Sequence, residues 1–356
     1  MAAQTAYAEL LESSRAQELH RSIASLSGSF ASKDIKGKRY WYYQYRDIDG
    51  STKQLYVGPG TPEVQSMMDR SKETPSKAIQ PLARAAIAHG CASILPKHFR
   101  IIRRLSEYGF FHAGGVLIGT HAYLAYGNML GVRWGTGDRT HDVDFAHAGK
   151  NISIALPANI HVDVHKAVES LDLGFLPIST FDGTSGATYL NPSNPELRLD
   201  FLTTISRSGG KPFTPANLNV TLHPLKFMEF SLENTTQAAL FCAEGAVVVN
   251  VPSPVRYAFH KLLVYGERSP AFRTKARKDI AQAVALVAYF KQHQPDELRS
   301  AWADLISRGR GWVKRVNEGC AALQTFAPEL DALQFFLSAE TAAASPHALP
   351  RRRRKN

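Results

Sequence analysis

The stretch Thr140-His141-Asp142-Val143-Asp144-Phe145 places two acidic residues two positions apart among strand-forming residues. Residues i and i+2 of a β-strand point to the same face, so Asp142 and Asp144 are predicted to project together while Val143 and Phe145 face the core. Two carboxylates held about 7 Å apart along a strand repel each other unless a cation lies between them. The stretch therefore predicts a strand with an acidic, metal-binding face.

A third acidic residue occurs in a second predicted strand, Glu196-Leu197-Arg198-Leu199-Asp200-Phe201-Leu202. Its apolar residues alternate onto one face, which leaves Asp200 on the other. A buried acid is costly without a partner. If this strand pairs with the first, three carboxylates meet at one point. Such a cluster suits two hard divalent cations, Mg²⁺ or alternatively Mn²⁺, which bind triphosphate oxygens and activate an attacking hydroxyl.

A glycine turn precedes the acidic strand. Val116-Leu117-Ile118 reads as a strand that breaks into Gly119-Thr120, and the helix-like residues 122–126 follow. Glycine lets the backbone approach a ligand closely, and the amides at a helix N-terminus favour phosphate. The turn is therefore a predicted phosphate-binding element.

Together, Gly119-Thr120, the Thr-x-Asp-x-Asp stretch and the strand of Asp200 resemble the signature of polymerase-β-like nucleotidyltransferases. The chain is most similar to a bacterial branch akin to the AbiEii-type toxins of abortive-infection systems. In that branch a helical domain follows, with a Lys-Leu pair and a later Lys/Arg-Asp pair, which Lys261-Leu262 and Lys278-Asp279 match. The resemblance covers roughly residues 95–290. It implies an α/β (α+β) nucleotidyltransferase core with a mixed sheet and a C-terminal helical domain.

This resemblance also implies a reaction, the transfer of a nucleoside monophosphate (NMP) from a nucleoside triphosphate (NTP) to a hydroxyl with release of pyrophosphate. The implied catalytic and metal-binding residues are Asp142, Asp144 and Asp200. The implied nucleotide-binding residues are Gly119 and Thr120, at the β- and γ-phosphates, and Lys261 and Lys278, which would neutralise the triphosphate charge from the helical domain.

The chain departs from the family pattern in two places. Thr120 replaces the more usual Ser or second Gly, a mild change because the hydroxyl remains. The distance from Gly119 to Asp142 is longer than in typical members, because residues 127–139 intervene. This insert is either a lid over the nucleotide, with Arg133 or Arg139 touching phosphate, or a passive surface loop.

The acceptor is inferred from charge. The 356 residues include 42 Lys and Arg against 31 Asp and Glu, a net charge of +11, of which residues 351–355 supply five. A basic surface favours polyanions. With the toxin resemblance, this predicts RNA as the acceptor, with a tRNA 3′ end as one candidate, and a toxin-like or phage-defence role with an antitoxin or other partner protein. The alternatives are a protein AMP-transferase, a small-molecule acceptor, or a non-catalytic nucleic-acid-binding protein on the same fold.

The predicted domains are an N-terminal helix and β-hairpin (1–60), the core with leading helices (61–251), a helical domain (252–340) and a basic disordered tail (341–356). The hairpin, with strands near 40–46 and 53–59, mixes aromatic and basic residues. Such residues either stack on nucleic acid, through Trp41, Tyr43 and Tyr45, or form a packed face against a helix.

Several classes of protein are excluded by pattern. No apolar run reaches the roughly 18–20 residues that span a bilayer, and the N-terminus lacks a secretory signal, so a cytoplasmic protein is expected. The three cysteines lie far apart, which excludes a disulfide framework or zinc motif. The pair His161 and His165 has no further ligand of metal type, and Asp163 between them is better explained as a helix N-cap.

Overall fold

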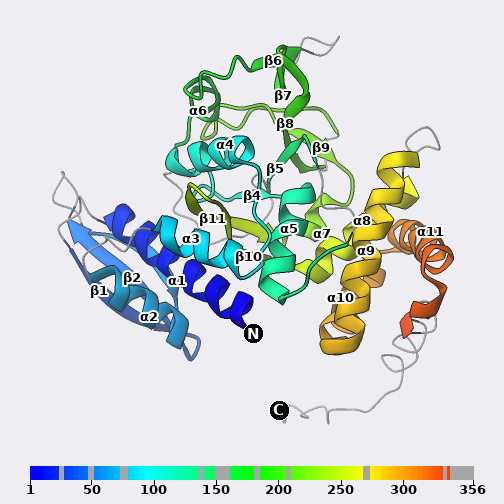
Figure 1. The fold of residues 1–356 in the computed structure, drawn as a ribbon, viewed down its shortest axis with the longest axis horizontal. Coiled ribbons are helices and arrows are strands. Elements are labelled where there is room, and N and C mark those ends of the chain that lie inside the picture. Colours follow the sequence, from blue (N-terminus) through cyan, green and yellow to red (C-terminus); the bar gives the residue numbers. More distant parts are fainter. Residues whose placement is uncertain are drawn as a thin grey trace, which may run out of the picture. The chain divides into compact units, whose positions relative to one another are not determined.

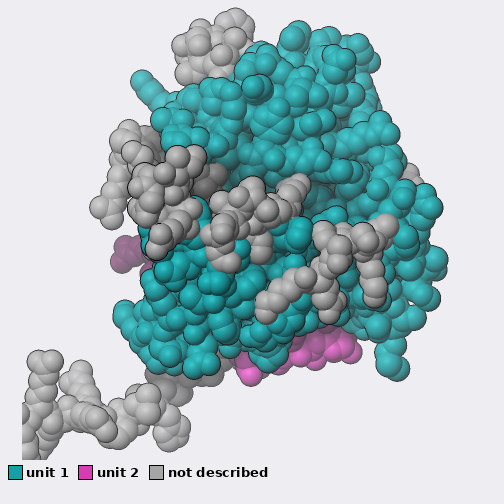
Figure 2. Space-filling view, turned by 90° about the vertical axis from the view of Figure 1, so that its left-hand side faces the viewer, with its two compact units in different colours: residues 1–252 teal, residues 253–356 magenta. Residues whose placement is uncertain are grey.

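The structure is a computed structural model. It describes residues 1–23, 28–46, 52–72, 79–135, 140–148, 161–179, 185–205, 210–267, 273–331 and 335–336. The chain divides into two compact units, Met1–Pro252 and Ser253–Asn356 (Figure 2).

A six-stranded mixed sheet forms the centre of the first unit, in the order β4-β5-β8-β7-β6 with β9 beside β8 (Figure 1). The β5–β8 and β8–β9 pairs are parallel and the others antiparallel. This architecture confirms the mixed α/β class and the pairing of the strands of Asp144 and Asp200. The strands are β4 (Gly115–Leu117), β5 (Val143–His147), β6 (Leu176–Ser179), β7 (Ser185–Asn191), β8 (Asn194–Thr204) and β9 (His223–Leu225).

Successive residues of β5 and β8 point to opposite faces of the sheet, and one of these faces is aromatic. The rings of Phe145 and Phe201 stack with centroids 5.3 Å apart, and Phe110 packs edge-on against both. Tyr189 of β7 packs on Phe201 from the neighbouring strand. All four side chains are buried. This core fixes the direction of the intervening residues, so Asp144 and Asp200 point to the opposite face.

Seven helices are described in the first unit, along with a separate β-hairpin. The helices are α1 (Ala2–Ile23), α2 (Pro62–Lys72), α3 (Ile79–Ala88), α4 (Pro96–Glu107), α5 (Gly119–Leu130), α6 (Val164–Glu169) and α7 (Met228–Leu232), and the hairpin is β10 (Thr235–Cys242) with β11 (Gly245–Pro252). Helix α1 packs on this hairpin, where Leu10 is fully buried near Phe241 and the Ala239 amide donates to the Tyr7 hydroxyl at 3.1 Å. The predicted boundary at residue 60 therefore does not separate α1 from the core.

The N-terminal β structure has three strands, not the two that were predicted. They are β1 (Gly28–Ile35), β2 (Lys38–Arg46) and β3 (Thr52–Pro59), in that order. The hairpin of β2 and β3 is confirmed. β1 was not predicted, because its mix of small, polar and charged residues carries no strand pattern. A tight turn at Lys36-Gly37, both with positive φ (51° and 75°), connects β1 to β2.

The second unit is helical in its described part, as the apolar stripes predicted. Its helices are α8 (Pro254–Glu267), α9 (Arg273–His293), α10 (Pro295–Ser307), α11 (Arg310–Phe326) and the short 3-10 helix Pro328–Leu330. None of the described helices in either unit is both long and apolar enough to cross a bilayer.

Candidate active site

Asp144 and Asp200 lie directly opposite each other on neighbouring parallel strands. They are register partners in the β5–β8 pair, and both side chains are partly exposed. Neighbouring strands are about 4.8 Å apart, so the two carboxylates share one small region of the sheet surface. Like charges directly opposite each other are destabilising. The arrangement is thus one that a bound cation would stabilise.

Gly119 lies directly beside the Asp144 carboxylate. It begins α5 with a φ of +64°, and a Cβ atom at this position would overlap Oδ2 of Asp144. The preceding amide, that of Ile118, donates to the Asp144 carbonyl oxygen at 3.0 Å. Only glycine satisfies both the left-handed backbone and the close approach. The first turn of α5 therefore begins at the Asp144 carboxylate.

Thr188 holds Asp200 in place from the other side. Its hydroxyl donates to Oδ1 of Asp200 at 2.6 Å, because β7 pairs with β8 so that the two residues are opposite each other. Thr188 was not among the predicted site residues.

Asp142 and Thr120 differ in setting from the other predicted residues. Asp142 lies just before the first residue of β5, and its amide donates to the Thr140 hydroxyl at 3.3 Å. It is therefore held by a turn and not by the strand ladder. The Thr120 side chain is buried, with 5% exposed.

A cavity of about 500 Å³ opens beside Asp200. Its walls include Thr188 and Arg198, which are polar, and apolar side chains such as Leu202 and Leu225. Arg198 is exposed and lies two residues from Asp200 on the same face of β8. The acidic centre therefore adjoins a space with room for part of a substrate and a cationic side chain at its wall.

Comparison with known proteins identifies the family of the chain. Residues 97–307 match the model of a family described as Nucleotidyltransferase. The chain belongs to this family. The match includes all three candidate carboxylates, Gly119, Thr120 and the two candidate lysines, and it leaves β1–β3 outside.

Among solved structures, an antigenic nucleotidyltransferase-like protein from Paracoccidioides brasiliensis is similar to this nucleotidyltransferase family member at 16% sequence identity. The alignment covers 64% of this chain and 95% of that one, with a TM-score of 0.32. No curated protein was found to match the chain.

A buried histidine pair supports the glycine turn of this nucleotidyltransferase. His98 of α4 and His121 in the first turn of α5 are 3% and 1% exposed, and His98 Nδ1 lies 3.0 Å from His121 Nε2. Burial, with smaller effects of Lys97 and His141, lowers the pKa of His98 from 6.5 to about 4. His98 is therefore uncharged at neutral pH. The contact between the two rings connects α4 to the start of α5.

Acidification is expected to destabilise the fold through His98. The unfolded chain protonates His98 near pH 6.5, whereas the folded protein does so only near pH 4. Unfolding therefore takes up a proton in this window, and stability falls as the pH decreases through it, by up to about 1.4 kcal/mol per pH unit for one group. Buried His147, whose pKa is also lowered by burial, acts in the same direction.

Urea unfolding across pH 4–7 checks this expectation, with His98→Gln compared with His89→Gln, a histidine that is exposed. His98→Gln should flatten the dependence of the unfolding free energy on pH, and His89→Gln should not. Equal slopes for the wild type and His98→Gln would contradict the lowered pKa.

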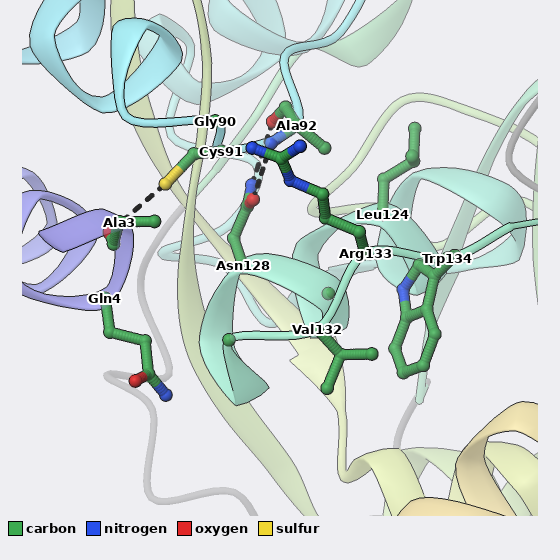
Figure 3. Close-up of a pocket in the computed structure, with 12 residues that line it drawn as sticks. Ala3, Gln4, Gly90, Cys91, Ala92, Leu124, Asn128, Val132, Arg133 and Trp134 are labelled. Carbon is green, nitrogen blue, oxygen red and sulfur yellow. Dashed lines mark hydrogen bonds between the residues drawn. The ribbon is translucent and has the colours of Figure 1, made fainter. Parts of the chain in front are cut away.

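The predicted insert is partly helix. Residues 127–130 form the last turn of α5, and Trp134 then stacks on Tyr123 and donates to its carbonyl oxygen at 2.7 Å. The guanidinium of Arg133 lies beside Gly90 in a cavity of about 390 Å³ (Figure 3). Since α5 has 12 residues, this end is about 18 Å from the Gly119 end. Arg133 therefore does not reach a phosphate at Gly119, and Arg139 lies outside the described residues.

The interpretation of Asp163 as a helix cap is confirmed. Its carboxylate accepts from the Lys166 amide at 2.9 Å at the start of α6. The described residues contain no cluster of three His, Cys, Asp or Glu side chains that could hold a metal ion.

Lys261 forms an ion pair within the second unit. Its ammonium donates to Asp279 Oδ1 at 2.7 Å, and the two side chains are 15% and 5% exposed. It also lies 5.1 Å from the centroid of the Tyr257 ring. These contacts connect α8 to α9. The role of Lys261 and Lys278 at a triphosphate stays a prediction.

Lys261→Met should destabilise the protein by about 3 kcal/mol, because it leaves the Asp279 carboxylate buried without its cation. Adding Asp279→Leu should restore part of that loss. Thermal unfolding and NTP binding are measured on both variants and on Lys314→Met, which removes an exposed lysine. A Lys261→Met protein as stable as the Lys314→Met control would contradict the structural role.

Proposed function

We propose that this family member is a metal-dependent enzyme that transfers an NMP from an NTP to a hydroxyl of RNA. One observation carries the proposal: two carboxylates, Asp144 and Asp200, are opposed in register beside a glycine turn that only glycine can form. Opposed carboxylates next to helix amides are the groups that a metal-bound triphosphate needs.

The donor set fits Mg²⁺ or Mn²⁺. Mg²⁺ is usually held by one or two carboxylates together with substrate phosphates, not by an all-protein cage. Two opposed carboxylates, with Asp142 nearby in sequence, meet that description, although the described residues form no three-ligand cluster. When bound, the metal ions would neutralise phosphate charge and increase the acidity of the acceptor hydroxyl.

The residues of the chain then have distinct tasks. Asp142, Asp144 and Asp200 are proposed to hold the metal ions, and the backbone at Gly119 and Thr120 binds the β- and γ-phosphates. The acceptor oxygen forms a bond to the α-phosphorus while the bond from that phosphorus to the β-phosphate oxygen breaks. The hydroxyl proton leaves on the Asp200 side, and Thr188 positions Asp200 for this step by its 2.6 Å hydrogen bond.

The acceptor is proposed to enter beside Asp200. The cavity of about 500 Å³ adjoins this carboxylate, and Arg198 at its wall supplies a positive charge suited to a phosphodiester. The net charge of +11 favours RNA over a protein or a neutral small molecule. A tRNA 3′ end as acceptor, and a toxin-like or phage-defence role with an antitoxin, are finer parts of the same proposal.

The proposal is tested by incubating the protein with each α-³²P-labelled NTP, Mg²⁺ or Mn²⁺, and either total RNA or a cell lysate. Label in RNA that depends on metal supports it. Label only in protein would identify an AMP-transferase type of activity. No transfer to any acceptor, together with RNA binding, would favour the non-catalytic alternative.

A further inference from the structure

The pairing register of β1–β3 sorts the aromatic residues of the N-terminal sheet onto two faces. Tyr43 pairs with Phe30 and is 8% exposed, with the rings 5.2 Å apart. Trp41 and Tyr45 alternate onto the same face as Tyr43. The packed-face interpretation therefore holds for Tyr43, and this face is not suited to bind a ligand as a whole.

The opposite face carries a second group of aromatic rings, which we call the tyrosine face: Tyr40, Tyr42 and Tyr56. Tyr42 and Tyr56 are register partners with ring centroids 5.5 Å apart, and Tyr40 lies 6.3 Å from Tyr56. Tyr56 is 38% exposed, and the other two rings are partly exposed. Three adjacent rings at the surface of a sheet form a platform on which flat groups can stack.

Positive charge surrounds the tyrosine face. Lys33 is the register partner of Tyr40, and its ammonium lies 5.2 Å from the centroid of the Tyr42 ring. Lys38 alternates onto the same face, and Lys36 lies in the adjoining turn; all three lysines are exposed. Across 28–59 the sequence has six basic residues and three acidic ones, Asp34, which pairs with Arg39, and Asp47 and Asp49 in the connecting residues 47–51.

We infer that the tyrosine face binds single-stranded RNA. Stacking rings bordered by lysines are the means by which proteins hold unpaired bases and their phosphates. In a duplex the base faces are covered by their neighbours, so a flat platform would gain only phosphate contacts. The choice of RNA over DNA rests on the proposed function. The surface lies outside the family match of residues 97–307, so it would be an addition to the shared transferase core.

The inference is tested by fluorescence anisotropy with labelled oligo(A) and oligo(U), on the full chain, without NTP or divalent metal so that no transfer takes place. Replacing Tyr40, Tyr42 and Tyr56 together by Thr, a strand former, should weaken binding about tenfold or more, because base stacking is lost. Replacing the same residues by Phe should leave the affinity close to wild type, since the rings remain.

The lysines provide a charge-matched comparison within one sheet. Lys33→Gln with Lys38→Gln should weaken binding and lower the salt-dependence slope by about 1.4, because each lysine that contacts a phosphate of a single strand contributes about 0.7. Arg39→Gln with Lys53→Gln removes the same charge from the opposite face and should have a smaller effect. If circular dichroism shows that the Thr variant is unfolded, the RNA affinities of the Phe variant and of the two lysine variants test the inference instead.

Three results would overturn the inference: wild-type affinity in the folded Thr variant, equal losses for the two charge variants, or tighter binding of duplex RNA or of DNA than of single-stranded RNA. RNA binding through this face without any NMP transfer would contradict only the proposed function. NMP transfer without RNA binding at this face would contradict only this inference.

Discussion

Asp144→Asn and Asp200→Asn are each expected to lower the rate of NMP transfer by about a thousandfold or more, because each removes a charged metal ligand at the reaction centre. Since the two residues would act as one site, the double variant should lose little more than either single variant. The stability of both proteins should hold or rise, because the two carboxylates are opposed on neighbouring strands. Pyrophosphate release and thermal unfolding measure the two effects.

Asp172→Asn is the matched control. Asp172 is exposed and has a φ of +52°, a conformation that asparagine adopts readily. This variant loses the same charge elsewhere in the first unit and should transfer at the wild-type rate. Strong residual transfer in the Asp144/Asp200 double variant would remove these residues from the catalytic role.

Gly119→Ala is expected to lower transfer by about a hundredfold, an effect of ~2.7 kcal/mol. A methyl group at this position would overlap Oδ2 of Asp144 and would also require alanine to adopt a φ of +64°. The carboxylate or the first turn of α5 must therefore move, and misplacement of about 1 Å near a reaction centre has costs of this order.

Gly174→Ala separates the effect of left-handed backbone strain from the effect of the close approach to Asp144. Gly174 has a φ of +71°, but a Cβ there would meet nothing within 4 Å. It should lose stability by the strain of the left-handed backbone alone, about 1–2 kcal/mol, and keep its transfer rate. If Gly119→Ala loses the same stability as Gly174→Ala and transfers normally, the close approach to Asp144 has no functional role.

The alternation of apolar and polar residues along the strands predicts the two opposed carboxylates of this site. It does not predict residues that lie where strand pairing is irregular. Apolar residues on either side of Asp144 and Asp200 are enough to predict two strands with acids on the same face. The position of Thr188 opposite Asp200 could not be predicted, because the register of the β7–β8 pair shifts between Leu190 and Asn191. Asn191 pairs with Asn194, whereas Leu190 pairs with Arg198. Counting back from the turn would place Thr188 opposite a different residue.

Tertiary contacts decide the other differences. The end of α5 at Leu130 has a signal in the sequence, because Gly131 is its left-handed C-cap residue with a φ of 70°. The position of Arg133 beside Gly90 depends on tertiary packing that sequence periodicity does not encode. In the same way, aromatic content alone does not show whether the rings of the hairpin bind a ligand or pack against a helix. Only the register, with Tyr43 opposite Phe30 and Tyr42 opposite Tyr56, shows which rings are packed and which face outward.

Electron paramagnetic resonance of Mn²⁺ tests metal binding at the opposed carboxylates directly and does not depend on the acceptor. Mn²⁺ is titrated into the wild type and into Asp144→Asn, Asp200→Asn and Asp172→Asn, each with a non-hydrolysable NTP analogue. The wild type and Asp172→Asn should bind Mn²⁺ equally, and the other two variants should bind about tenfold or more weakly, since each lacks a charged ligand. Equal Mn²⁺ affinity in all four proteins would contradict the claim.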